Sequence, residues 1–248
     1  MTIRMVHRRT VVALAATATG VALLTPMAIA AATSSNHGGA YEPVLDPANF
    51  VSAIDNPYYP LPVGRLLVYK GVRDGQLQID KVRVTDKTRV IEGITATTVS
   101  DIAKTPDGTL LEKTRDWYAQ DNEGTVWYLG EDTASYGSSG QIDTSGSWLA
   151  GVNDGEPGII MEANPRIPDA YRQEYLKGEA EDTAWITGRG GQVTIPYGTV
   201  GPVLKSLEHT ALEPNVVDLK VYAPGLGIVK EKALAGDQEV AKLVRVRG

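Results

Sequence analysis

The chain has 248 residues, a formal net charge of −6 at pH 7, three histidines and no cysteine. Without cysteine it can form no disulfide, thiolate nucleophile or zinc–thiolate site. The acidic balance argues against nucleic acid or anionic lipid head groups as the main partner, because both need a basic footprint.

The first 30 residues have the pattern of a cleaved signal peptide. Arg4, Arg8 and Arg9 precede an apolar run over residues 11–24, and the small residues 28–32 provide an A-x-A cleavage site. This run is shorter than the roughly 20 residues that cross a bilayer. We therefore expect a secreted, extracellular protein with no membrane span after cleavage; an uncleaved anchor is the alternative. The arginine pair also fits the twin-arginine export route, with an ordinary basic leader as the alternative.

Residues 31–45 are small and polar, which predicts a flexible lead-in, and we expect residues 46–248 to form a single β domain. Asp46 as N-cap and Pro47 at the first helical position predict a short helix that ends before Pro57.

Strand patterns dominate from residue 66 onward. Leu77 and Ile79 alternate with polar residues, and a change of phase at residues 80–81 predicts a β-bulge. Short strands with a turn about every 8–12 residues are typical of a sandwich, barrel or cradle. We predict a mainly β fold, a single antiparallel half-barrel or cradle-like sheet with one or two short helices. The expected strands are 66–72, 88–101, 109–121, 125–131, 171–176, 181–187, 192–195, 203–210, 216–222, 227–231 and 240–247.

The clearest hairpin surrounds residues 122–124, which fit a three-residue loop with glycine in the left-handed position. That loop places Trp117 opposite Leu129, Arg115 opposite Glu131 and Tyr118 opposite Tyr128, with tryptophan and leucine on the core face. Tyrosine rings beside hydrogen-bonding groups on the other face indicate a polar ligand site. A solvent-facing side with ordinary tyrosine pairing is the alternative. The residues on this other face are Asp116, Tyr118, Gln120 and Tyr128.

A second candidate is the segment around Lys177-Gly178. If these two residues form the turn, Glu174 lies opposite Glu181, and like charges in that position are destabilising. A shared proton, a bound cation or Arg172 would offset the repulsion, and such a carboxyl pair could serve acid–base or glycosidic chemistry. A three-residue turn is the alternative, because it shifts the register, separates the two carboxylates and leaves them solvated.

Two weaker signals concern calcium and histidine. The run 151–165 contains Asn153, Asp154 and Glu156, oxygen ligands that suit calcium, although an ordinary surface loop has the same composition. Outside the leader and lead-in the sole histidine is His209, and no G-x-S-x-G nucleophile motif accompanies it. Calcium is therefore a candidate ion, and no other cofactor is expected.

Most of residues 50–232 resembles a group of exported bacterial proteins of unknown role. The order of strands is also similar to that of exported half-barrels that cradle lipid or lipoprotein chains, which implies a carrier fold but no activity. Many such carriers are lipid-anchored through a cysteine that this chain lacks. The matching stretches are residues 56–61 with 68–69, 116–121, 126–131, 157–161, 171–175 and 222–227.

We expect a secreted protein that holds an apolar or amphiphilic small molecule in a β cradle. A secreted hydrolase or lyase acting on a glycan or small ester, through paired carboxylates and tyrosine, is the alternative. A structural envelope protein without a ligand is a third. The candidate catalytic residues are Asp116, Tyr118, Glu131, Glu174 and Glu181. The candidate ligand-binding residues are Trp117, Gln120, Trp127, Tyr128, Trp148, Arg172 and Tyr222.

Overall fold

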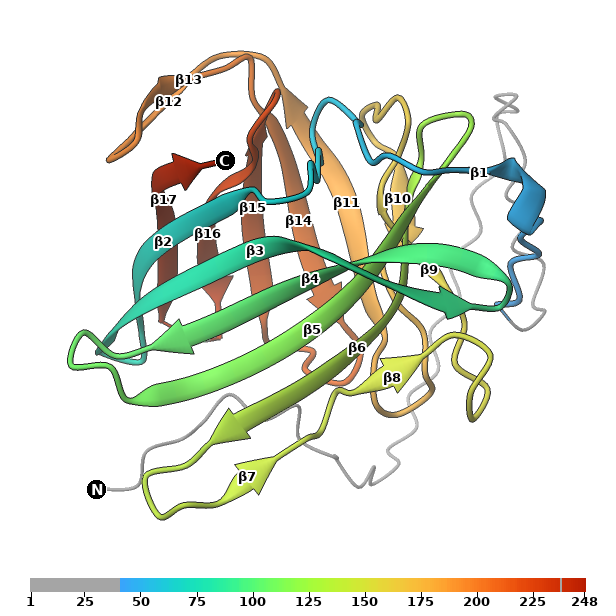
Figure 1. The fold of residues 1–248 in the computed structure, drawn as a ribbon. Helices are drawn as coiled ribbons and strands as arrows, with labels where there is room; N and C mark the ends of the chain where they lie inside the picture. Colours follow the sequence, from blue (N-terminus) through green and yellow to red (C-terminus); the bar gives the residue numbers. More distant parts are fainter. Residues whose placement is uncertain (1–40, 237) are drawn as a thin grey trace, which may run out of the picture.

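The structure, a computed structural model, describes residues 41–236 and 238–248 (Figure 1). The predicted signal peptide, its arginine pair and residues 31–40 of the lead-in lie outside the described residues. In the part of the chain that is described, no helix has the length and apolarity to cross a membrane.

One antiparallel sheet runs through most of the described chain. Three short strands pair at its side: β1 (Phe50–Val51) with β5 (Leu110–Asp121), and β8 (Trp148–Leu149) and β9 (Gly158–Met161) with β6 (Val126–Tyr136). A separate hairpin joins β12 (Val193–Ile195) to β13 (Gly198–Val200). From one edge to the other the main order is β10 (Ala170–Arg172), β11 (Asp182–Arg189), β14 (Leu204–Thr210), β15 (Val217–Ala223), β16 (Gly227–Ala235), β17 (Glu239–Arg247), β2 (Leu66–Arg73), β3 (Gln76–Ile91), β4 (Ile94–Lys104), β5 (Leu110–Asp121), β6 (Val126–Tyr136) and β7 (Ile142–Asp143).

The sheet curves into an open half-barrel. The last strand, β17, pairs with β2, so the two ends of the domain meet in the middle of the sheet. The edge strands β7 and β10 do not pair with each other among the described residues. Figure 1 shows the long strands β3–β6 crossing in front of β11 and β14–β17, and this arrangement confirms the predicted half-barrel.

A single turn of 3-10 helix, Pro47–Asn49, is the helical element that precedes the sheet. The Asp46 carboxylate caps it as predicted, accepting a hydrogen bond from the backbone N–H of Ala48 at 3.0 Å. Just upstream, the phenol of Tyr41 donates to the carbonyl of Pro157 at 3.0 Å, which docks the described end of the lead-in on the domain.

The first half of β3 faces the opposite way from what its apolar residues suggest. Leu77 is 60% exposed, whereas Gln78 is buried and points with Asp80 into the half-barrel. The prediction of a bulge at residues 80–81 is wrong. β3 pairs with β2 without interruption, and its register with β4 shifts between Val84 and Thr88 instead.

Candidate functional site

The half-barrel encloses a cavity of about 310 Å³, within the range of small-molecule sites. One wall is formed by β3–β6, the opposite wall by β14–β17 and β2, and the segment after Asn56 supplies Tyr59. Its lining mixes apolar groups with many carboxyl groups. The apolar residues are Pro60, Leu61, Leu67, Val82, Val99, Ile160, Leu226 and Ile228, and the acidic residues are Asp80, Asp101, Glu112, Asp116, Glu131, Glu174, Asp182, Glu208, Glu231 and Glu239.

Three aspartates cross the first wall on a diagonal. Asp80 on β3 lies opposite Ala103 of β4, so Asp101 of β4 is two residues away from that pairing. Asp101 lies opposite Thr114 of β5, so Asp116 is offset by two residues in the same way. Diagonal neighbours on one face of a sheet lie roughly 7–8 Å apart. The three carboxyl groups therefore form a spaced row rather than a single cluster.

Burial makes these carboxyl groups hard to ionise. It raises the pKa of Asp80, Asp101 and Asp116 from the usual 3.8 to about 7 in each case. Arg73 opposes this rise at Asp80, and the hydrogen bond from Tyr128 opposes it at Asp116. Near neutral pH the wall therefore carries both protonated and ionised carboxyl groups.

Two carboxyl groups share one phenol. The Tyr128 hydroxyl lies 2.6 Å from an oxygen of Asp116 and 2.6 Å from an oxygen of Glu131. A phenol has one proton to donate. When the hydroxyl is hydrogen-bonded to both carboxyl groups at once, one of these two hydrogen bonds therefore needs a proton from a carboxyl group. Because burial raises the pKa of Asp116 to about 7, its carboxyl group can supply this shared proton near neutral pH, as acid–base chemistry requires.

This arrangement depends on a bulge in the β5–β6 hairpin. Tyr118 lies opposite Tyr128 as predicted, but Trp117 pairs with Gly130 rather than with Leu129. The extra residue turns Glu131 toward the cavity and places it opposite Asp116 instead of Arg115. The predicted register was therefore wrong beyond the bulge.

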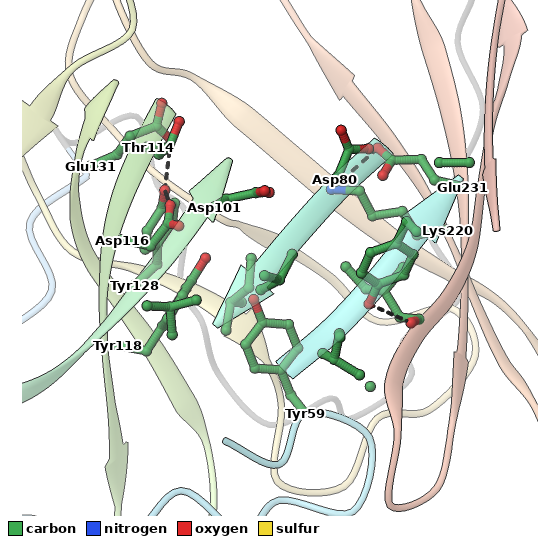
Figure 2. A pocket seen from close by; sticks show the side chains of 18 of the residues that line it. Tyr59, Asp80, Asp101, Thr114, Asp116, Tyr118, Tyr128, Glu131, Lys220 and Glu231 are labelled. Atoms are coloured by element: carbon green, nitrogen blue, oxygen red, sulfur yellow. Dashed lines mark hydrogen bonds and ion pairs between the residues drawn. The ribbon is translucent and has the colours of Figure 1, made fainter. Parts of the chain in front are cut away.

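Tyrosine rings form the floor beside the diagonal of aspartates. Tyr118 and Tyr128 stack with their ring centroids 4.7 Å apart, and Tyr59 meets Tyr118 edge-on at 5.4 Å (Figure 2). Tyr118 and Tyr128 are each 6% exposed, so the solvent-facing alternative for this side of the hairpin is wrong. Trp148 packs edge-on against Tyr128 and donates its indole N–H to Glu174 at 2.9 Å.

On the opposite wall, basic side chains form ion pairs with the acidic side chains. The Lys220 ammonium lies 2.6 Å from Glu208 and 3.9 Å from Glu231. Burial alone would lower the pKa of Lys220, but these two carboxylates outweigh burial and hold it well above its usual value. Arg73 forms a bidentate pair with Glu239 at 2.7 and 3.0 Å. Figure 2 shows Lys220 and Glu231 across the cavity from Asp116 and Glu131.

Several residues predicted as ligand contacts lie away from the cavity lining. Trp117 packs in the core under the guanidinium of Arg89, 4.2 Å from its ring. Gln120 accepts backbone N–H groups of Asp55 and Asn56 at 2.9 and 2.8 Å, which anchors the segment leading to β2. These contacts give both side chains a structural role.

Three more predicted ligand contacts are engaged elsewhere. Trp127 donates its indole N–H to Asp121 in the hairpin turn at 2.9 Å. The Arg172 guanidinium lies over the ring of Tyr175, 4.6 Å from its centroid. Tyr222, 1% exposed, donates its hydroxyl to Glu208 at 3.2 Å and so helps to hold that carboxylate in the second wall.

Glu174 and Glu181 do not form the predicted opposed pair. Leu176 bridges to Ala180, so the turn has three residues and the alternative register is confirmed. The Glu181 carboxylate accepts the backbone N–H of Gly178 at 2.8 Å within that turn. Glu174 is 2% exposed and lines the cavity, so the expectation that it is solvated after such a turn is wrong.

The segment predicted as a calcium loop adopts a tight turn. Asn153 and Asp154 both have positive φ, 53° and 63°, a conformation that these two residue types tolerate. Within residues 41–236 and 238–248, no group of three His, Asp or Glu side chains is placed to hold a metal ion. Calcium binding here stays a prediction.

The sequence analysis missed the site residues on β2, β3, β4 and β14–β17. Asp80 lies at the predicted bulge, and Asp101, Glu208 and Glu231 lie in expected strands without being singled out as site residues. The available signal was alternation, because Gln78, Asp80 and Val82 share one face of β3. That face becomes an interior only when the sheet curves.

Comparison with known proteins yields two distant structural neighbours. No family model and no curated protein matches the chain. A protein from Bacteroides fragilis, provisionally described as exported and as having a YmcC-like fold, aligns with a TM-score of 0.45 and 15% identity. A provisionally described lipoprotein from Parabacteroides distasonis aligns with a TM-score of 0.40 and 14% identity. Each alignment covers 78% of this chain and 100% of the neighbour.

Proposed function

We propose that the protein is an exported binding protein that holds an amphiphilic small molecule inside its half-barrel. The observation that carries the proposal is the cavity itself: about 310 Å³, with leucine, valine and tyrosine side chains next to carboxyl groups. A purely structural sheet would fill this space with side chains, because protein interiors are closely packed.

Unsatisfied polar atoms support a bound guest. The Gln173 side-chain nitrogen is buried without a hydrogen-bond partner, as is one carboxyl oxygen of each of Asp80 and Asp101. All three residues line the cavity. A buried polar atom without a partner costs roughly 1–3 kcal/mol, and a polar group of the ligand would recover that energy.

A plugged cavity tests the proposal. Ala103 of β4 lines the cavity, while its neighbour Ile102 points to the other face of the sheet. We expect wild-type protein and Ile102→Trp to bind the uncharged fluorescent probe N-phenylnaphthylamine, and Ala103→Trp to lose most of that binding. Equal fluorescence titrations for both tryptophan variants would contradict binding inside the half-barrel.

The shared proton favours a second candidate, acid–base catalysis on a small ester or glycan. Asp116 and Glu131, bridged by Tyr128, would act as the acid and the base. Turnover of chromogenic ester or glycoside substrates should then disappear in Asp116→Asn. An unchanged rate in that variant, or no turnover by the wild type, excludes this candidate and leaves the binding function.

A further inference from the structure

We propose that the ligand is an elongated organic cation with two or more amine groups joined by short alkyl segments. This inference rests on the proposed function, because it assigns a chemical class to the molecule in the cavity. It is drawn from the diagonal of Asp80, Asp101 and Asp116, from the tyrosines beside it and from the buried amide of Gln173.

The two walls differ in how their charges are balanced. Lys220 and Arg73, the cationic residues among the described lining residues, form ion pairs with Glu208, Glu231, Glu239 and Glu112. The row of aspartates lies on the other wall. One carboxyl oxygen of Asp80 and one of Asp101 have no hydrogen-bond partner. The negative charge available to a ligand therefore lies along the first wall.

The spacing of the row favours a polyatomic cation over a metal ion. Metal ligands must converge on one point, and no described group of three acidic or histidine side chains does so. Steps of roughly 7–8 Å between diagonal neighbours match amines separated by a few methylene groups. Each ammonium would meet one carboxyl group.

The tyrosines suit the rest of such a molecule. Tyr59, Tyr118 and Tyr128 line the same cavity and present aromatic rings. Ring faces attract ammonium groups and give methylene groups an apolar contact. An aromatic floor beside a row of acids therefore binds alternating charged and apolar segments.

Gln173 supplies an observation independent of the acids. It is 3% exposed, it lines the cavity, and its side-chain nitrogen has no partner. The amide can present its oxygen instead by a half-turn of its last torsion, and the oxygen accepts an N–H group. A buried amide facing the cavity without a partner indicates a missing polar group of a ligand.

Calorimetric titration with defined amines tests the inference. We expect cadaverine, a five-carbon diamine, to bind wild-type protein at least tenfold more tightly than pentylamine, and pentanediol to bind more weakly still. Asp80→Asn and Asp101→Asn should each weaken cadaverine binding at least tenfold. The matched control Asp86→Asn removes an exposed carboxylate, with 74% of its side chain accessible, and should leave binding unchanged.

Three outcomes would overturn the amine class: equal affinities for cadaverine and pentylamine, no effect of either aspartate variant, or calcium chloride binding more tightly than cadaverine. N-phenylnaphthylamine separates this failure from failure of the proposed function. The amine class alone is rejected if the probe binds wild-type protein, fails to bind Ala103→Trp, and is not displaced from wild-type protein by cadaverine. Absence of both kinds of binding rejects both proposals. The same probe verifies that each aspartate variant is folded.

Discussion

Replacing Asp101 by asparagine should stabilise the ligand-free protein at alkaline pH. Burial raises the pKa of Asp101 to about 7, and Asp80, Glu112 and Glu231 add to the rise. These carboxyl groups come from β3, β5 and β16, so acidic groups face Asp101 from both walls. Ionising it in the folded state is therefore unfavourable, and asparagine removes that cost while keeping the shape of the side chain.

The magnitude follows from the pKa. A rise from 3.8 to about 7 corresponds to about 4 kcal/mol at full ionisation. Water in the cavity screens part of this, so we expect about 2 kcal/mol. Because the folded-state pKa is raised, the folded state binds more protons between about pH 4 and pH 7, and the wild type loses stability as pH rises through that window. The gain of Asp101→Asn is thus largest near pH 8 and vanishes near pH 4.

Urea unfolding at several pH values measures this difference. Asp101→Asn should unfold at higher urea concentration than the wild type at pH 8, with the gap closing as the pH is lowered. The control Asp86→Asn, on an exposed part of β3, should stay within about 0.5 kcal/mol of the wild type throughout. A gap that is constant with pH, or an Asp101→Asn variant less stable at pH 8, would refute the reasoning.

Three further changes probe other parts of the site. Tyr128→Phe removes the hydrogen bond that lowers the pKa of Asp116. The pKa of Asp116 should therefore rise above about 7 in a carbon-detected NMR titration. An unchanged titration contradicts the shared proton. Lys220→Met leaves the buried Glu208 and the partly buried Glu231 without their cation and should cost about 3 kcal/mol or more in urea unfolding at neutral pH; a neutral effect at pH 7 contradicts the balanced wall. Gly158→Ala places a methyl group 2.2 Å from the backbone of Gln173 and should cost about 2 kcal/mol or more, seen as a lower Tm; wild-type stability would contradict that close approach.

The fold was predictable because it depends on local patterns. Alternating residues and regular turns located most strands, and Asp46 with Pro47 marked the short helical turn that precedes the sheet. These signals depend on neighbours in the chain, which the sequence displays directly. The curvature of the sheet leaves no such local signal.

The site was only half predictable for the same reason. Asp116, Tyr118 and Tyr128 share one hairpin, so their common face followed from alternation within it. Asp80 and Lys220 meet the same cavity from strands far apart in the sequence, which only the pairing of β17 with β2 explains. The bulge that turns Glu131 inward adds one residue that alternation cannot foresee.

The bound guest is the central claim, and native mass spectrometry of protein purified from its native host tests it most directly. The wild type should carry a small organic molecule that is released on mild activation, and Ala103→Trp prepared in parallel should not. A bare polypeptide mass for both proteins, with N-phenylnaphthylamine also failing to bind, would contradict the account.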